Sequence, residues 1–317
     1  MTATVTIRPR MLMILSENWT LTSGRRLPDL VGWAQIAEDA GFDAVMLSEH
    51  VVLGPDASEN GVMGNPRDYA MPGNQDPFMP WPNSMLLLAA MASVTSTIRL
   101  VGGAIIAPLR HPLMLARELG TLDLISGGRL VVQPTVSWSK DEYDALGVSF
   151  TKRGKILDEQ LQILELAWKG GPFSFHGEYF DFDDVTLEPR AHHADGPRLW
   201  FGGQGMSKPL LRRLTRYGHG FHPLGNPTAA DLQMLDDGLS DTGRQLSDLE
   251  LVGGTRAVFP DNHSCADLGQ AMEPIREQIE RGFTTFCIKP SQFIDDDSEL
   301  SSFSQDVIRR VEAMLAS

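Results

Sequence analysis

The sequence of 317 residues contains only two cysteines, Cys265 and Cys287, and their spacing fits neither a disulfide framework nor a set of metal ligands. We expect both to be core thiols in a protein of a reducing compartment. No stretch approaches the roughly 20 apolar residues of a membrane span, and no apolar run follows the charges near the N-terminus. A cytoplasmic protein without a membrane partner is therefore expected.

Positive charge is also scarce, since 27 Lys and Arg stand against 41 Asp and Glu, for a net charge of −14. No run of basic residues occurs, whereas a nucleic-acid backbone requires a concentrated basic face. A nucleic-acid partner is therefore excluded. The same acidity means that a few local groups must hold any anionic ligand against an unfavourable overall field.

Several catalytic motifs are missing: the G-x-S-x-G elbow of acyl transfer, the phosphate-binding P-loop, and a G-x-G-x-x-G run after a strand. The histidines offer no metal site either, because no two of them have a spacing that presents both to one ion. This applies to His50, His111, His192, His193 and His222. Metal-dependent hydrolysis is not expected.

What is present is a regular alternation of short apolar runs and longer helical patterns, which is typical of a parallel sheet flanked by helices. The apolar runs are 11–15, 43–47, 98–104, 130–134, 199–202, 220–222, 249–259 and 284–288. Eight strands, each followed by a helix and with no linker between halves, predict one (β/α)8 TIM barrel over residues 1–317. A doubly wound open sheet is the alternative.

Two segments interrupt this alternation. Residues 51–83 are rich in Pro, Gly, Asn and Met and are much longer than an ordinary βα loop of about 2 to 6 residues, so we interpret them as a lid. Residues 172–190 contain alternating apolar residues about a His-Gly turn, which predicts an inserted β-hairpin.

Residues 37–50, AEDAGFDAVMLSEH, read as a helix end, a turn at Gly41, a buried strand, and then Glu49 and His50. Ligands of parallel α/β proteins bind at the carboxyl ends of the strands, so these two side chains are candidate site residues. The alternative is that Glu49 caps the next segment and His50 is an ordinary loop residue.

Two glycine pairs are further candidates. Gly202 and Gly203 end a strand before a helix, where their backbone N–H groups and the helix N-terminus favour a phosphate. Gly102 and Gly103 lie inside a buried strand, which suggests the close approach of a flat ligand or a distorted peptide. The alternatives are a tight turn for the first pair and tight strand packing for the second.

In their order and spacing these stretches resemble the bacterial luciferase-like family of flavin- and deazaflavin-dependent oxidoreductases. The resemblance covers roughly residues 10–293. It is carried by A-E-x-A-G-F-D-A ending in Glu49-His50, T-S-x-I-R-L (95–100) running into A-P-L-R-H-P, L-D-L-I-S-G-G-R-L (122–130), E-Y-D-A-L-G-V with Arg153 and L-D-E (157–159), W-F-G-G, and Y-G-H-G-F-H-P (217–223).

The resemblance implies a barrel that binds FMN or coenzyme F420 at its carboxyl face. The ring would lie near Ala104 and Ile105, where the family often carries a non-prolyl cis peptide, and His50 would donate or accept the proton. The cofactor residues that it implies are Glu49, Gly103, Ala104, Ile105, Thr135, Gly202, Gly203, Gln204, Gly205, His222 and Leu224. Trp81, Trp138 and Met79 would contact the substrate.

The sequence departs from the family after the fourth strand, where residues 133–138 replace a Gly-rich run to which some deazaflavin dehydrogenases add a carboxylate. Trp138 would take the place of that acid, so a sugar-phosphate type of dehydrogenation that uses a paired His and Glu is not expected, and the pocket should be more apolar. Lys289 and Arg256 could meet the anionic tail of F420, or they form surface ion pairs.

The expected activity is hydride exchange between F420 and a small, largely apolar molecule. One alternative is a two-component monooxygenase that uses reduced FMN from a flavin reductase partner, with the lid excluding water. Another is a barrel that binds flavin without catalysis. Family habit favours a homodimer.

Overall fold

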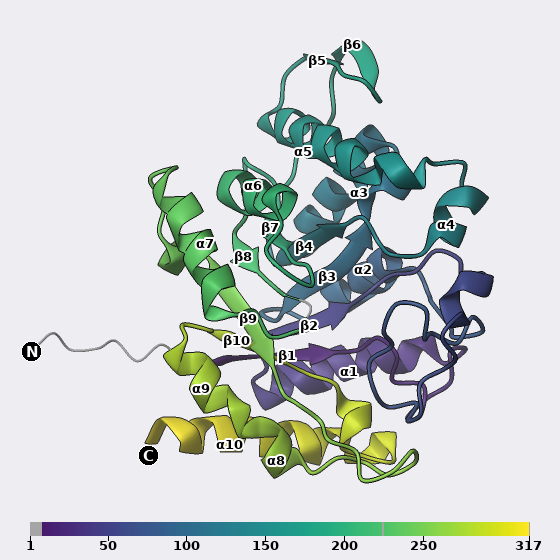
Figure 1. Cartoon of the computed structure of the whole chain (residues 1–317), viewed down its shortest axis with the longest axis vertical. Helices are drawn as coiled ribbons and strands as arrows, with labels where there is room; N and C mark the ends of the chain where they lie inside the picture. Colours follow the sequence, from purple (N-terminus) through teal and green to yellow (C-terminus); the bar gives the residue numbers. More distant parts are fainter. Residues whose placement is uncertain (1–7, 224, 317) are drawn as a thin grey trace, which may run out of the picture.

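The computed structural model describes residues 8–223 and 225–316, and within them eight parallel strands close into a barrel in the order β1-β10-β9-β8-β7-β4-β3-β2 (Figure 1). The predicted (β/α)8 barrel is confirmed, and the open-sheet alternative is wrong. The strands are β1 (Arg10–Ile14), β2 (Ala44–Leu47), β3 (Arg99–Ile106), β4 (Leu130–Thr135), β7 (Arg198–Phe201), β8 (Gly220–Phe221), β9 (Glu250–Gly254) and β10 (Thr285–Ile288).

Helices surround the barrel (Figure 1). They are α1 (Leu27–Ala40), α2 (Ser84–Val94), α3 (Pro112–Ile125), α4 (Lys140–Ala145), α5 (Arg153–Lys169), α6 (Lys208–Tyr217), α7 (Ala229–Ser240), α8 (Leu268–Met272), α9 (Pro274–Glu280) and α10 (Leu300–Ala316). Pro274 lacks an N–H group and separates α8 from α9. None of the helices described here is long and apolar enough to cross a membrane.

The inserted hairpin is confirmed as an antiparallel pair, β5 (Phe173–His176) and β6 (Asp181–Val185). It is attached to α5 by Glu159, whose carboxylate accepts hydrogen bonds from the backbone N–H groups of Glu178 and Tyr179 at 2.6 and 3.0 Å. One acidic residue of the L-D-E motif therefore positions the insertion.

Side chains of each strand alternate between the barrel interior and the helical layer. In β10, Cys287 belongs to the interior cluster, whereas Phe286 and Ile288 pack against the helices. The interior cluster consists of Leu12, Ile14, Ala44, Met46, Val101, Val131, Trp200, Val252 and Cys287. Of the two thiols expected in the core, Cys287 is buried and Cys265 is only half-buried.

A charged cluster closes the amino end of the barrel. The buried Glu250 carboxylate accepts two hydrogen bonds from Arg99 at 2.7 and 2.8 Å, lies 3.3 Å from Arg10, and also accepts from the hydroxyl of Thr285. Burial raises the pKa of Glu250, but its hydrogen bonds and the charge of Arg99 lower the pKa more, so the net shift is downward. These side chains therefore occupy the amino end of the barrel.

Two motif residues tie the turn before β3 to its neighbours. Glu38 accepts hydrogen bonds from the N–H groups of Ser96, Thr97 and Ile98 at 2.9, 2.6 and 2.8 Å. Arg129 donates to the carbonyl oxygens of Thr95 and Ile98 at 3.0 and 2.8 Å. These residues of the A-E-x-A-G-F, T-S-x-I-R-L and I-S-G-G-R-L motifs thus fix the start of β3.

Glu38 makes stability depend on acid pH. Burial raises its pKa, but the N–H groups of Ile98, Thr97 and Ser96 lower it more, to about 2 from an ordinary 4.5. The stabilisation is present above the unfolded pKa and is lost as the pH falls from 4.5 towards 2. Glu38→Gln should therefore lower the denaturation midpoint at pH 7 and flatten its pH dependence in that window. Urea unfolding across this pH range measures both.

The matched control is Glu280→Gln, which neutralises an exposed carboxylate at the end of α9. It should keep the acid dependence of the wild type. An equal slope in the Glu38→Gln protein would contradict the prediction.

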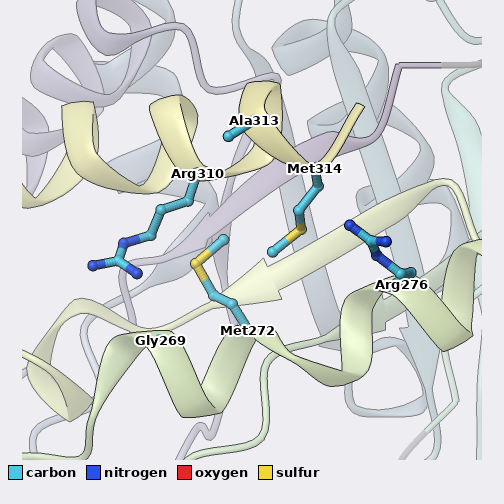
Figure 2. A pocket seen from close by; sticks show the side chains of 6 residues that line it. All are labelled: Gly269, Met272, Arg276, Arg310, Ala313 and Met314. Atoms are coloured by element: carbon cyan, nitrogen blue, oxygen red, sulfur yellow. The ribbon is translucent and has the colours of Figure 1, made fainter. Parts of the chain in front are cut away.

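Two hollows lie in the outer layer of the molecule. One of about 270 Å³ lies between α8, α9 and α10, and Figure 2 shows Met272 and Met314 directed into the space between these helices. The other, of about 360 Å³, is lined by residues of α5 and α6 and by the segment that precedes β8, including His219. Neither hollow is lined by the strand ends where ligands bind in barrels of this type.

Candidate active site

His50 follows β2 and is held by a carboxylate from α4. Its Nδ1 lies 3.2 Å from Oε2 of the fully buried Glu142, which also accepts hydrogen bonds from the N–H of Val51 at 2.7 Å and the hydroxyl of Ser137 at 3.1 Å. An ionised carboxylate only accepts hydrogen bonds, so Nδ1 of His50 carries the hydrogen. In the neutral imidazole with this tautomer, the lone pair of Nε2 is available to a ligand.

Two indoles surround the His50 ring. Trp81 and Trp138 both meet it edge to face, with ring centroids 4.9 and 5.4 Å away. The His50 side chain is 10% exposed, and Nε1 of Trp81 is buried without a hydrogen-bond partner in the described part of the chain. Met79, two residues before Trp81, is half-buried. Three of the predicted site residues, His50, Trp81 and Trp138, thus lie together.

Glu142 was missed by reasoning from the sequence. The sequence placed Trp138, and no acid, after β4, but α4 supplies a carboxylate that pairs with His50. The signal was the first residue of the E-Y-D-A-L-G-V motif, but an acid on a short helix more often faces solvent. Only the packing of α4 against the segment after β2 reveals its role.

Glu49 is fully engaged within the chain. Its Oε1 accepts from the N–H of Ile106 at 2.9 Å and from Arg110 at 2.8 Å, while Oε2 accepts from Arg110 at 2.6 Å. This paired arrangement holds the carboxyl end of β3 against the end of β2. The geometry makes Glu49 a residue that positions the site, and a direct contact with a ligand stays a prediction.

Strand β3 is irregular at Gly103 and Ala104, next to the glycine pair for which a distorted peptide was predicted. The peptide between Gly103 and Ala104 is cis, and the pairing with β4 shifts register between Gly103 and Ile105. A Cβ atom at Gly103 would lie 2.7 Å from Sδ of Met46, so the strand packs tightly there. Ala104 is half-buried between buried neighbours and is the most accessible residue of the irregularity.

The glycines after β7 differ from one another. A Cβ at Gly202 would lie 1.7 Å from the carbonyl oxygen of His222, so the backbone directly after β8 requires this glycine. At Gly203 the nearest atom would be 3.4 Å away, and at Gly205 no atom lies within 4 Å. Tight packing therefore explains Gly202, whereas Gly203 and Gly205 leave space for a ligand.

These residues precede α6 and have unused backbone donors. In residues 8–223 and 225–316, no acceptor is found for the N–H groups of Gly203, Gln204 and Gly205. Ser207 caps the helix by accepting from the N–H of Leu210 at 3.4 Å. Free N–H groups before a helix N-terminus suit a phosphate or another anion.

His222 takes part in a hydrogen-bonded chain across the barrel. Nδ1 lies 2.8 Å from Oε1 of Gln133, and Nε2 lies 3.6 Å from Sγ of Cys287. Burial lowers the pKa of His222 to about 4 and raises that of Cys287 to about 12, so both are neutral near pH 7. Both ring nitrogens of His222 are thus used internally.

Thr135 and Leu224 are the two remaining residues that were predicted to contact the cofactor. Thr135 is half-buried at the end of β4, where its hydroxyl accepts from the N–H of Ser137 at 3.4 Å. Leu224 lies outside the described residues. In that described part of the chain, no group of three or more His, Cys, Asp or Glu residues is placed to hold a metal ion.

The two cations proposed for an anionic tail have different surroundings. Lys289 is fully buried, and its ammonium group donates to the carbonyl oxygen of Asp68 at 3.0 Å and lies 5.2 Å from the centre of the Tyr69 ring. Arg256 is exposed. Neither forms an ion pair with a carboxylate of residues 8–223 or 225–316, so the surface ion-pair alternative is wrong.

The long segment after β2 lies on the side of the barrel towards which the β1 arrow points, next to α4 (Figure 1). Its middle is fixed by Arg67, which is 8% exposed and donates to the carbonyl oxygens of Ser291 and Ile294 at 2.9 and 3.0 Å. Arg67 also pairs with Asp295 at 2.6 Å. The segment therefore extends from β2 to the far side of β10, and its role as a lid stays a prediction.

Residues 10–281 match the model of a family described as luciferase-like monooxygenase. An uncharacterised protein of Mycobacterium tuberculosis is 26% identical over 273 residues, 78% of this chain and 89% of its own. The FMNH(2)-dependent dimethylsulfone monooxygenase of Pseudomonas putida is 25% identical over 69% of this chain and 53% of its own. The F420-dependent tetrahydromethanopterin reductase of Methanopyrus kandleri has the same fold, with a TM-score of 0.67, 15% identity and coverage of 96% of this chain and 99% of its own.

Proposed function

Because this chain belongs to the luciferase-like monooxygenase family, we propose that it is an oxidoreductase that binds F420 and exchanges hydride with a small, largely apolar molecule. The observation that carries the proposal is the pair of His50 and buried Glu142, which leaves Nε2 of His50 as a proton acceptor at the carboxyl end of the barrel. Family membership supports an oxidoreductase, and solved structures of this fold include F420-dependent enzymes.

The residues at the strand ends fit such a cofactor. The unused N–H groups of Gly203, Gln204 and Gly205 would hold its phosphate, and the space at Gly203 and Gly205 allows that approach. The half-buried Ala104 in the irregular part of β3 would support the ring. When bound, F420 supplies a ring carbon that accepts or donates hydride.

Hydride exchange at a carbon that bears oxygen also requires movement of a proton at that oxygen. Nε2 of His50 would accept this proton in the oxidative direction and return it in the reductive one. The Glu142 carboxylate stabilises the imidazolium that forms and fixes the orientation of the ring. Trp81 and Trp138 exclude water from the ring edges, which strengthens this electrostatic interaction.

A monooxygenase that uses reduced FMN is the second candidate, favoured by the Pseudomonas putida relative, whose name specifies FMNH(2) dependence. That activity would need a flavin reductase as a partner. The same residues would hold the phosphate of FMN, and Trp81 and Trp138 would again exclude water.

Titration of the purified protein with F420 and with FMN, each oxidised and reduced, separates these functions. Fluorescence quenching in one buffer gives all four affinities. Micromolar or tighter binding of F420, with FMN much weaker, is the expected result. Preference for FMN would assign the protein to the monooxygenase class, and binding of neither would remove both candidates.

Gly203→Val tests the proposed phosphate site. The added side chain crowds the backbone approach, so cofactor affinity should fall by at least about tenfold. The fold should tolerate it, because a Cβ at Gly203 lies 3.4 Å from Leu210, an ordinary contact distance. Gly32→Val, on α1 with no atom within 4 Å of its Cβ, is the control. Unchanged affinity in the Gly203 variant would mean that the glycine only forms a turn.

A further inference from the structure

We infer that Lys289 binds an acidic group of the substrate, so that the substrate is a small organic anion with an apolar body. The inference rests on the proposed function, since it names the substrate class of the same site. It follows from the direction of the side chain, from its lack of a charged partner and from its distance to His50.

The direction of Lys289 follows from the alternation of β10. Thr285 contacts Glu250 at the amino end of the barrel, and Cys287 lies in the interior cluster. The backbone remains extended at Lys289, with φ −108° and ψ 114°, so the alternation continues for two more residues. Lys289 therefore points inward at the carboxyl end, one layer above Cys287.

The ammonium group of Lys289 is buried without an opposite charge. Its side chain is 0% exposed, and its hydrogen-bond acceptor is the carbonyl oxygen of Asp68. Within the described part of the chain, no carboxylate lies within 4 Å of it. A buried charge without a charged partner is costly, and an anionic ligand would offset that cost.

Other charged groups act on Lys289 from a greater distance. Burial lowers its pKa, while Glu17 and Asp68 raise it, and burial dominates. An anion that replaces the Asp68 carbonyl as acceptor would favour the protonated form more strongly than a neutral oxygen does.

The distance between Lys289 and His50 determines how long a ligand must be to contact both residues. β10 is paired with β1, and β1 is paired with β2, so one strand separates the two residues. With strands about 4.8 Å apart, they emerge roughly 10 Å from each other. Trp81 and Trp138 provide apolar surface at the His50 end. A molecule with an apolar end at His50 and an acidic group at Lys289 fits this spacing.

The test compares 4-phenylbutyrate with its neutral amide, 4-phenylbutyramide, by calorimetric titration of the full chain with and without its preferred cofactor. The wild type should bind the carboxylate at least about tenfold more tightly than the amide. Lys289→Met should reduce that ratio to about one, and Lys289→Arg should retain most of it. Lys169→Met, at the exposed end of α5, makes the same change in net charge and should leave the ratio unchanged.

A ratio that Lys289→Met leaves unchanged, or a wild type that does not prefer the carboxylate, would overturn the inference. So would a lower F420 or FMN affinity in Lys289→Met with an unchanged probe ratio, because the lysine would then serve the cofactor. Failure of the proposed function is a separate result. If the wild type binds neither F420 nor FMN, the probe ratio of the cofactor-free protein still reports on Lys289.

Discussion

His50→Ala should lower turnover by about 10²- to 10⁴-fold while cofactor affinity stays within about a factor of two of the wild type. The loss follows from removal of the proton acceptor that the Glu142 carboxylate orients at 3.2 Å. The affinity should hold because the groups proposed to bind the cofactor phosphate lie before α6. Single-turnover absorbance of the bound cofactor measures the rate, and fluorescence titration measures the affinity.

Glu142→Gln tests whether the carboxylate beside His50 contributes to turnover. It keeps the shape of the side chain but removes the charge that stabilises imidazolium, so turnover should fall, though less than in His50→Ala. Ser137→Ala is the matched control, since it removes another hydrogen-bond partner of Glu142 without changing charge. Unchanged turnover in His50→Ala would exclude His50 from the mechanism, and cofactor binding without turnover in the wild type would favour a non-catalytic flavin-binding barrel.

Gly202→Ala should produce the largest loss of stability of any single substitution considered, more than about 4 kcal/mol. The new methyl group would lie 1.7 Å from the carbonyl oxygen of His222 and 2.9 Å from Nε2 of Gln133. Backbone cannot yield as a flexible side chain can, so β7 and β8 would have to separate. Denaturant unfolding, or loss of soluble protein on expression, measures the effect.

Gly205→Ala is the control for that experiment, because no atom lies within 4 Å of its Cβ position. It adds the same methyl group three residues away and should leave stability close to that of the wild type. Equal stability of the two variants would show that β7 and β8 tolerate a wider separation than their packing indicates.

The barrel could be predicted from the sequence because the alternation of apolar patterns, and the Pro and Gly residues that bound helices and strands, are local properties of the chain. Residues 112–125 are the clearest case, since Pro112 begins the helix and Gly127 and Gly128 follow its C-cap, Ser126. The apolar run 249–259 was different, because β9 ends at Gly254, the last residue that pairs with β10. Where a strand ends depends on its neighbour, which an apolar run does not reveal.

The candidate site could be predicted only in part, for a similar reason. His50 could be predicted as a site residue because it follows a buried strand, and ligands bind at the carboxyl ends of the strands in a barrel. Glu49, next to His50, could face either a ligand or a partner within the chain. Its partner is Arg110, which lies 61 positions later, so the sequence around Glu49 does not reveal it. Glu142 depends in turn on how α4 packs, so its partnership with His50 appears only in three dimensions.

The motifs that carried the family resemblance are largely structural. Glu38 and Arg129 fix the turn before β3, and Glu159 holds the hairpin insertion. Such residues identify a fold strongly and its chemistry weakly. This is why the family could be named from the sequence while the cofactor could not.

Arg67 divides the segment over the barrel into two parts, which backbone hydrogen bonds from Asn60 to Gly73 and from Gln75 to Ala57, both at 2.7 Å, hold together. The first part is tied to α4, where the N–H of Asp56 donates to Asp141 at 2.9 Å. The second carries Tyr69 and Trp81 towards Lys289 and His50. Because these bonds couple the two parts, a sequence change after Arg67 that moves the backbone near Gly73 also acts on the part that is tied to α4. Relatives with different substrates should therefore differ in both parts of the segment together.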